Sequence, residues 1–181
     1  MDKKLGRTNN NTAIGFEAMT NATASECVAV GTKALKAQTT AARCTAVGSE
    51  AATAITTGSD TTAIGRSALA ACVTGSSNTV LGSKALMNYT GSQTTAIGVE
   101  ALFTCTTGTE NVAVGYYSLY NLTTGIYNTA VGPNGCLGSD NFEVLVLEDE
   151  MDVTRMDIEN VYELHTWVYD VFLPLLEAVE W

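Results

Sequence analysis

Few side chains of this sequence could do nucleophilic or acid–base chemistry, and none has a partner at catalytic spacing. His165 is the only histidine, and it falls in a stretch of helical periodicity, where we expect a structural role. Cys27 and Cys44 each lie four residues before a glycine of the repeat described below, and Cys72 and Cys105 each lie ten before one. A cysteine nucleophile needs a nearby base, which His165, in another segment, does not supply. The sequence therefore predicts buried thiols, no catalytic residue and no enzyme.

Metal and cofactor chemistry are equally weakly supported. The acids Glu148, Asp149, Glu150 and Asp152 could hold a calcium ion on a three-fold axis, but no Asp-x-Asp-x-Asp-Gly loop accompanies them. A solvated acidic neck is the simpler interpretation. Zinc would need further His or Cys ligands at suitable spacing, and no Gly-x-Gly-x-x-Gly or Gly-Lys-Thr run indicates a phosphate loop. We expect no metal and no cofactor.

A short unit, Thr-Ala-(Ile/Val)-Gly, recurs along most of the chain and is the strongest signal in the sequence. Its glycines are spaced by 16 or 17 residues, and a fixed period of this kind is typical of repeat architectures. The repeat glycines are Gly15, Gly31, Gly48, Gly65, Gly82, Gly98, Gly115 and Gly132.

Other positions keep the same register. A branched aliphatic residue directly precedes each repeat glycine: Ile14, Val30, Val47, Ile64, Leu81, Ile97, Val114 and Val131. Alanine, or Val80, precedes that residue, and an Ala-Leu pair usually follows the glycine by three and four positions. A second set, the turn glycines, lies seven before the next repeat glycine: Gly58, Gly75, Gly91, Gly108 and Gly125. A threonine column precedes it: Thr23, Thr40, Thr57, Thr74, Thr90, Thr107 and Thr124.

These columns predict a parallel β-solenoid of about eight coils, each reading strand, turn, strand, turn. Thr-Ala-Ile is a good strand sequence, and glycine on the opposite face lets another backbone approach closely. We expect the turn glycines to adopt positive φ. Each coil buries only one aliphatic side chain, one leucine and a few alanines, which hardly offsets the ordering of 17 residues. Packing several chains side by side would bury the alanine and leucine columns, so we expect an obligate oligomer.

The units resemble the left-handed parallel β-roll repeats of YadA-like trimeric adhesin heads. They resemble still more closely the Asn-Thr-Ala-Val-Gly-x-x-Ala-Leu-x-x-x-Thr-Thr-Gly repeats of bacteriophage tail and capsid fibres. The best match runs from Asn111-Val112-Ala113-Val114-Gly115 through Thr123-Thr124-Gly125 to Asn128-Thr129-Ala130-Val131-Gly132, and the resemblance covers about residues 9–138. It implies a left-handed roll of three chains without catalytic residues. Ala24 and Ala41 depart from it where later coils have the turn glycine.

The chain divides, on this reasoning, into a solenoid over residues 1–138, a neck and capping strand over 139–150, and an acidic helix over 151–181. Residues 1–139 carry a net charge of +1 and residues 140–181 one of −11. A heptad seam for trimerisation or docking lies on the predicted helix. Pro174 should end or kink this helix. The seam residues are Val161, Leu164, Val168, Val171 and Leu175.

The combined expectation is a homotrimeric virion fibre or spike subunit, a rigid spacer on the tail or capsid. Its acidic end would contact other virion proteins, and its surface could meet a host glycan or protein. A bacterial surface adhesin head is the alternative, and an ice-binding solenoid that uses the threonine column is a third. The sequence has no basic stripe for nucleic acid, no secretory signal and no apolar run long enough for membrane insertion. Synthesis in a host cytoplasm and residence in the virion follow as expectations.

Overall fold

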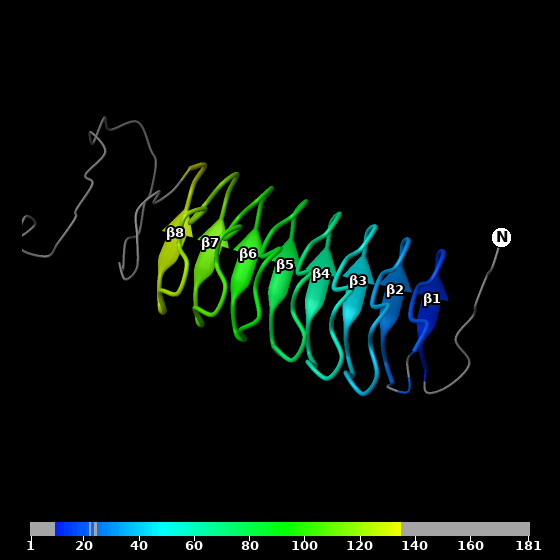
Figure 1. Cartoon of the computed structure of the whole chain (residues 1–181). Coiled ribbons are helices and arrows are strands. Elements are labelled where there is room, and N and C mark those ends of the chain that lie inside the picture. The colour runs from blue at the N-terminus through cyan, green and yellow to red at the C-terminus, as the bar shows by residue number, and fades with distance from the viewer. Residues whose placement is uncertain (1–9, 22, 24, 135–181) are drawn as a thin grey trace, which may run out of the picture. The chain divides into compact units, whose positions relative to one another are not determined.

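The computed structural model describes residues 10–21, 23 and 25–134, which form a β-solenoid (Figure 1). Eight strands of three residues, one per coil, lie side by side in a single parallel sheet in the order β1 to β8. The chain makes about seven complete turns between β1 and β8. The predicted mostly-β solenoid is therefore confirmed. The strands are β1 (Thr12–Ile14), β2 (Val28–Val30), β3 (Thr45–Val47), β4 (Thr62–Ile64), β5 (Thr79–Leu81), β6 (Thr95–Ile97), β7 (Val112–Val114) and β8 (Thr129–Val131).

The sheet is in register with the sequence repeat, so equivalent residues of successive coils stack on one another. Ala46 of β3, for example, pairs with Ala63 of β4. Because side chains alternate along a strand, the central residue of each strand points inward and is buried. Its two neighbours point outward, and this alternation is the same in all eight strands.

The remainder of each coil is not a second strand, which corrects the strand–turn–strand–turn expectation. Three non-glycine residues in each complete coil have positive φ, such as Arg43 (55°), Glu50 (61°) and Ala52 (48°) in the coil around β3. This left-handed conformation is incompatible with an extended strand. This conformation could not be predicted from the sequence, because residues as different as Glu, Leu and Arg occupy these positions.

The coils are joined outside the sheet by backbone hydrogen bonds from one coil to the next. Leu35 N donates to Ala51 O at 3.1 Å, and the equivalent Leu86 N donates to Ala101 O at 3.0 Å. Each coil is therefore hydrogen-bonded to the next around much of its circumference, as in other solenoids.

The interior is narrow and built mostly of alanine. The central strand alanines and the Ala-Leu pairs are buried within the single chain, which corrects the expectation that neighbouring chains bury these columns. One further buried column contains Gln38, Ile55, Cys72, Tyr89, Cys105 and Leu122. The hydroxyl of Tyr89 forms its hydrogen bonds inside the solenoid. It donates to Ser92 O at 2.9 Å and lies 2.8 Å from Thr94 Oγ1. Burial raises the pKa of this phenol to about 12.

Candidate interaction surface

The outward side of the sheet is an uncharged face of two columns that runs along all eight strands. We call it the sheet face. One column is the branched aliphatic residue that precedes each repeat glycine, and several members are well exposed: Ile14 by 54%, Leu81 by 46% and Val131 by 39%. The other column lies two residues earlier in the chain. Its members are Thr12, Val28, Thr45, Thr62, Thr79, Thr95, Val112 and Thr129.

Aromatic side chains gather near β6 and β7. The rings of Phe103 and Tyr120 are stacked, with centroids 5.3 Å apart, and Tyr117 contacts both Tyr120, at 4.9 Å, and Tyr116, at 4.1 Å. Tyr116 remains 52% exposed. Side-chain hydrogen bonds with Tyr116 and Glu100 raise the pKa of Tyr117.

The repeat glycines stack on one another directly after each strand. Their φ angles lie between 132° and 149°, a region that disfavours side chains. A Cβ at Gly65 would also lie 2.4 Å from the carbonyl oxygen of Gly82, and the same conflict recurs along the column. Both positive φ and the close approach of the next coil therefore require glycine here.

The turn glycines do not have the positive φ expected of them. Gly108 is instead required by space, because a Cβ there would lie 2.1 Å from the carbonyl oxygen of Gly125. From the sequence we expected positive φ at the turn glycines and a close approach of another backbone only at the repeat glycines. The actual φ > 0 positions are the repeat glycines and the non-glycine residues noted above.

Threonine hydroxyls on the side away from the sheet bond to the backbone of the next coil. Thr39 Oγ1 donates to Thr56 O at 3.0 Å, and Thr56 Oγ1 donates to Val73 O at 3.1 Å. Thr23 and Thr90, both members of the predicted column, donate in the same way to Thr39 O at 2.7 Å and to Thr106 O at 3.0 Å. In the Thr-Thr pairs the donor is instead the first threonine, such as Thr39, whereas the predicted column contains the second, such as Thr40. The doubled threonines were a signal that could have identified these donors. The predicted column is therefore divided between two positions of the coil and forms no regular ice-binding array.

An inner polar column lies four residues before each repeat glycine, and only its two cysteines were noted from the sequence. Asn111 Nδ2 donates to Gly125 O at 2.8 Å, and its Oδ1 accepts the backbone N–H of Asn128 at 2.8 Å. Asn78 accepts Thr94 N in the same way at 3.1 Å. The asparagine of the Asn-Thr-Ala-Val-Gly motif was the available signal. Its members are Asn11, Cys27, Cys44, Thr61, Asn78, Thr94, Asn111 and Asn128.

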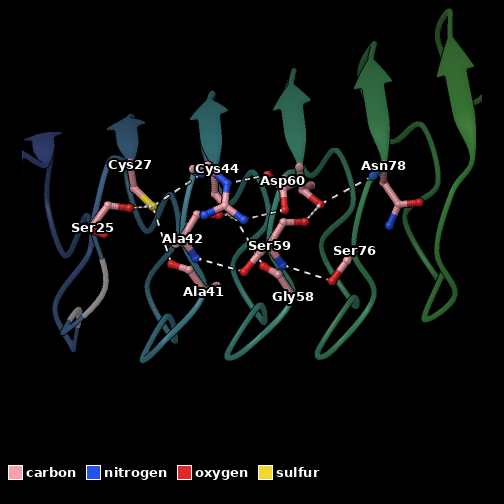
Figure 2. Close-up of polar contacts among 12 residues, drawn as sticks. Ser25, Cys27, Ala41, Ala42, Cys44, Gly58, Ser59, Asp60, Ser76 and Asn78 are labelled. Atoms are coloured by element: carbon pink, nitrogen blue, oxygen red, sulfur yellow. Dashed lines mark hydrogen bonds and ion pairs between the residues drawn. The ribbon is translucent and has the colours of Figure 1, made fainter.

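Cys27, Cys44, Cys72 and Cys105 are buried thiols, as expected. Cys27 and Cys44 belong to the inner column and touch: the backbone N–H of Cys44 donates to Cys27 Sγ at 3.4 Å (Figure 2). The side-chain hydrogen bond from Cys44 lowers the pKa of Cys27, and the same bond and burial raise the pKa of Cys44.

Charged residues on the solenoid pair across consecutive coils. Arg43 Nε lies 2.5 Å from Asp60 Oδ1, and Lys84 Nζ lies 3.3 Å from Glu100 Oε1. Exposed pairs of this kind contribute little stability. They do neutralise the solenoid locally, so the described residues present no extended field of one sign.

The described residues contain no group of three or more potential metal-ligating side chains. They also contain no helix long and apolar enough to cross a membrane. Several predicted features lie outside the described residues, among them the capping strand and the helix. The others are the acids Glu148, Asp149, Glu150 and Asp152, His165, and the seam residues Val161, Leu164, Val168, Val171 and Leu175.

No protein-family model, no curated protein and no solved structure matches the chain.

Proposed function

We propose that this chain is a structural fibre or spike subunit of a virion, a rigid spacer that assembles as a homotrimer through the sheet face. The observation that carries the proposal is the outward-facing aliphatic column, in which Ile14, Leu81 and Val131 are exposed and the other five members are partly exposed. The interior is mostly alanine, while the branched aliphatic side chains of every coil point outward, as in Ile14, Leu81 and Val131. An uncharged, regular face of this length is a surface for burial against other chains.

The energetics favour association of such a slim solenoid. Ordering the backbone costs about 1–2 kcal/mol per residue, and the alanine interior supplies little apolar area to offset it. Completing the burial of one aliphatic side chain contributes on the order of 1 kcal/mol. Eight such residues per chain therefore add several kcal/mol. Association of three chains and left-handed winding come from the resemblance to the trimeric roll repeats and are predictions.

The acidic segment supports a role as one part of a larger particle. Residues 140–181 carry a net charge of −11, and three copies at one end of a trimer would repel each other unless a basic partner or a cation offset them. We propose that this segment docks to a virion protein rich in Lys and Arg. The other end of the solenoid would then face the medium.

Labelling of particles tests the function. Antibodies against the solenoid, carried on gold, should decorate tail or capsid projections of particles released by producing cells. Decoration of the bacterial cell surface instead, with bare particles, would favour the adhesin-head alternative. A chain that lacks residues 151–181 should still form the solenoid but not join the particle. Normal incorporation of that truncated chain would contradict the docking role.

The outward threonines favour ice binding as a second candidate. Thr45, Thr62, Thr79 and Thr95 form a regular array beside the aliphatic column, and this is a better array than the column first considered. The two functions need the same face and exclude one another in one molecule. A trimer without thermal hysteresis supports the fibre, and a monomer with thermal hysteresis supports ice binding.

A further inference from the structure

Two of the buried cysteines stack on one another in consecutive coils. Cys27 and Cys44 directly precede β2 and β3, whose first residues, Val28 and Thr45, are paired in register. In-register residues of adjacent strands lie about 4.8 Å apart, inside the range of about 4.4–6.8 Å between the Cα atoms of a disulfide. Figure 2 shows the two side chains at equivalent positions of their coils. A bond between them would leave the coils in place.

The contacts of Cys27 make its sulfur the more nucleophilic of the two. It accepts the backbone N–H of Cys44 at 3.4 Å and the side-chain amide N–H of Gln38 at 2.9 Å. The neighbouring side chain of Cys44 is the largest influence that lowers the pKa of Cys27. Thiolates are the reactive form of cysteine, so Cys27 would react first and Cys44 would follow.

We propose that Cys27 and Cys44 are a redox pair that hydrogen peroxide converts to a disulfide between the coils of β2 and β3. The Cys27 thiolate attacks one peroxide oxygen, the O–O bond breaks, and the sulfenic acid forms with release of hydroxide. The Cys44 sulfur then attacks the sulfur of Cys27. The S–O bond breaks and water leaves with the proton of Cys44. In total two thiols are oxidised and one peroxide is reduced to two waters.

The other buried cysteines are an internal comparison. Cys72 and Cys105 belong to a different interior column, are two coils apart, and have Tyr89 between them. Two coils correspond to about 9.6 Å, beyond the roughly 7 Å over which cysteines can be bridged without backbone movement. They are buried to the same extent as Cys27 and Cys44, so burial alone does not distinguish the pairs.

The proposed bond would join coils 17 residues apart in sequence. It would constrain the unfolded chain and resist separation of the N-terminal coils. Peroxide reaches these sulfurs through local opening of a coil. The pair lies inside one chain, so the proposal does not depend on the trimer or on the proposed function.

Peptide mapping of the oxidised full-length protein tests the pairing. After treatment with hydrogen peroxide and blocking of the remaining thiols, trypsin should release peptides 8–33 and 44–66 as one disulfide-linked species. The melting temperature should rise on oxidation and return to its starting value with dithiothreitol. Cys44→Ser should abolish both effects, whereas the double variant Cys72→Ser and Cys105→Ser should keep both.

Free Cys27 and Cys44 in molecules whose other cysteines have been oxidised would overturn the pairing. So would a link between Cys72 and Cys105 as abundant as the predicted one. A Cys27–Cys44 link that leaves the melting temperature unchanged would overturn its stabilising role. The map of the wild-type chain decides the pairing even if the Cys44→Ser variant does not fold.

Discussion

At the scale of single residues, the solenoid depends on positions where no side chain fits. The two glycine columns meet this requirement for different reasons. The repeat glycines from Gly15 to Gly115 combine positive φ with a carbonyl oxygen of the next coil too close for a Cβ, whereas Gly58, Gly75 and Gly108 have only the close carbonyl. Substitutions can separate the two causes.

Gly65→Ala should destabilise the solenoid more than Gly132→Ala. Both residues have nearly the same φ, 134° and 133°, but a Cβ at Gly65 meets Gly82 O at 2.4 Å and one at Gly132 has no described atom within 4 Å. Backbone strain costs about 1–3 kcal/mol at either site, and overpacking adds about 1–3 kcal/mol at Gly65. Denaturant unfolding of the two variants measures the difference. Equal losses would show that coil spacing adjusts freely to a methyl group.

At Gly108, stability should fall in the order glycine, alanine, asparagine. A Cβ there meets Gly125 O at 2.1 Å, so alanine should cost about 1–3 kcal/mol and the larger asparagine more. If positive φ were the requirement, asparagine would be the better tolerated of the two, because it visits that conformation readily. Thermal melts of Gly108→Ala and Gly108→Asn distinguish the explanations, and an asparagine variant at least as stable as the alanine one would contradict the structure.

At the scale of elements, each coil is held to the next by the short sheet on one side and by threonine hydroxyls on the other. The sheet has only three residues per strand, so the coil-to-coil bonds outside it matter more than in a wide sheet. The threonine bonds have one interruption, at Val73, which accepts a hydroxyl bond but has no hydroxyl of its own.

Thr39→Val should lower the free energy of unfolding by about 0.5–1.5 kcal/mol, the usual net contribution of one hydrogen bond. It removes the Oγ1 donor to Thr56 O. Thr40→Val, at the adjacent exposed residue, is the matched control and should change stability by much less. Urea titration of both variants gives the comparison. A larger loss at Thr40 would restore the threonine column first predicted from the sequence.

The period, the stacking of columns and the buried alanines and leucines were predictable, because a repeat of 16–17 residues with constant columns has few other solutions. The shape of the coil was not. Left-handed φ at residues such as Glu50 and Arg43 leaves no compositional mark, so a second strand was predicted where none exists. The contact between Cys27 and Cys44 could have been found, since both lie four residues before a repeat glycine and therefore stack.

At the scale of the whole molecule, the sheet face is the feature expected of a subunit in an assembly and not of a monomer. The strands of this solenoid point their alanines inward and their branched aliphatic residues outward, while the leucines of the Ala-Leu pairs are buried in the interior. Such a surface is expected of chains whose core is completed by their partners.

Lysine on the sheet face should dissociate the assembly. Ile64→Lys with Ile97→Lys places two charges in the aliphatic column, where an interface would bury them unpaired. Lysine at Val73, which is 43% exposed and lies outside the strands, is the control and should leave assembly intact. Size-exclusion chromatography with light scattering reads the outcome. Dissociation by the Val73 variant and not by the double variant would place the interface elsewhere.

Sedimentation equilibrium of the wild-type chain at micromolar concentration tests the central claim most directly. The subunit mass is 19.0 kDa, so a homotrimer should sediment as a species of about 57 kDa. Circular dichroism of the same sample should show β-structure, and dilution should lose the β-signal and the trimer together. A stable monomer of 19.0 kDa with full β-type dichroism would contradict the account, because the sheet face would then need no partner.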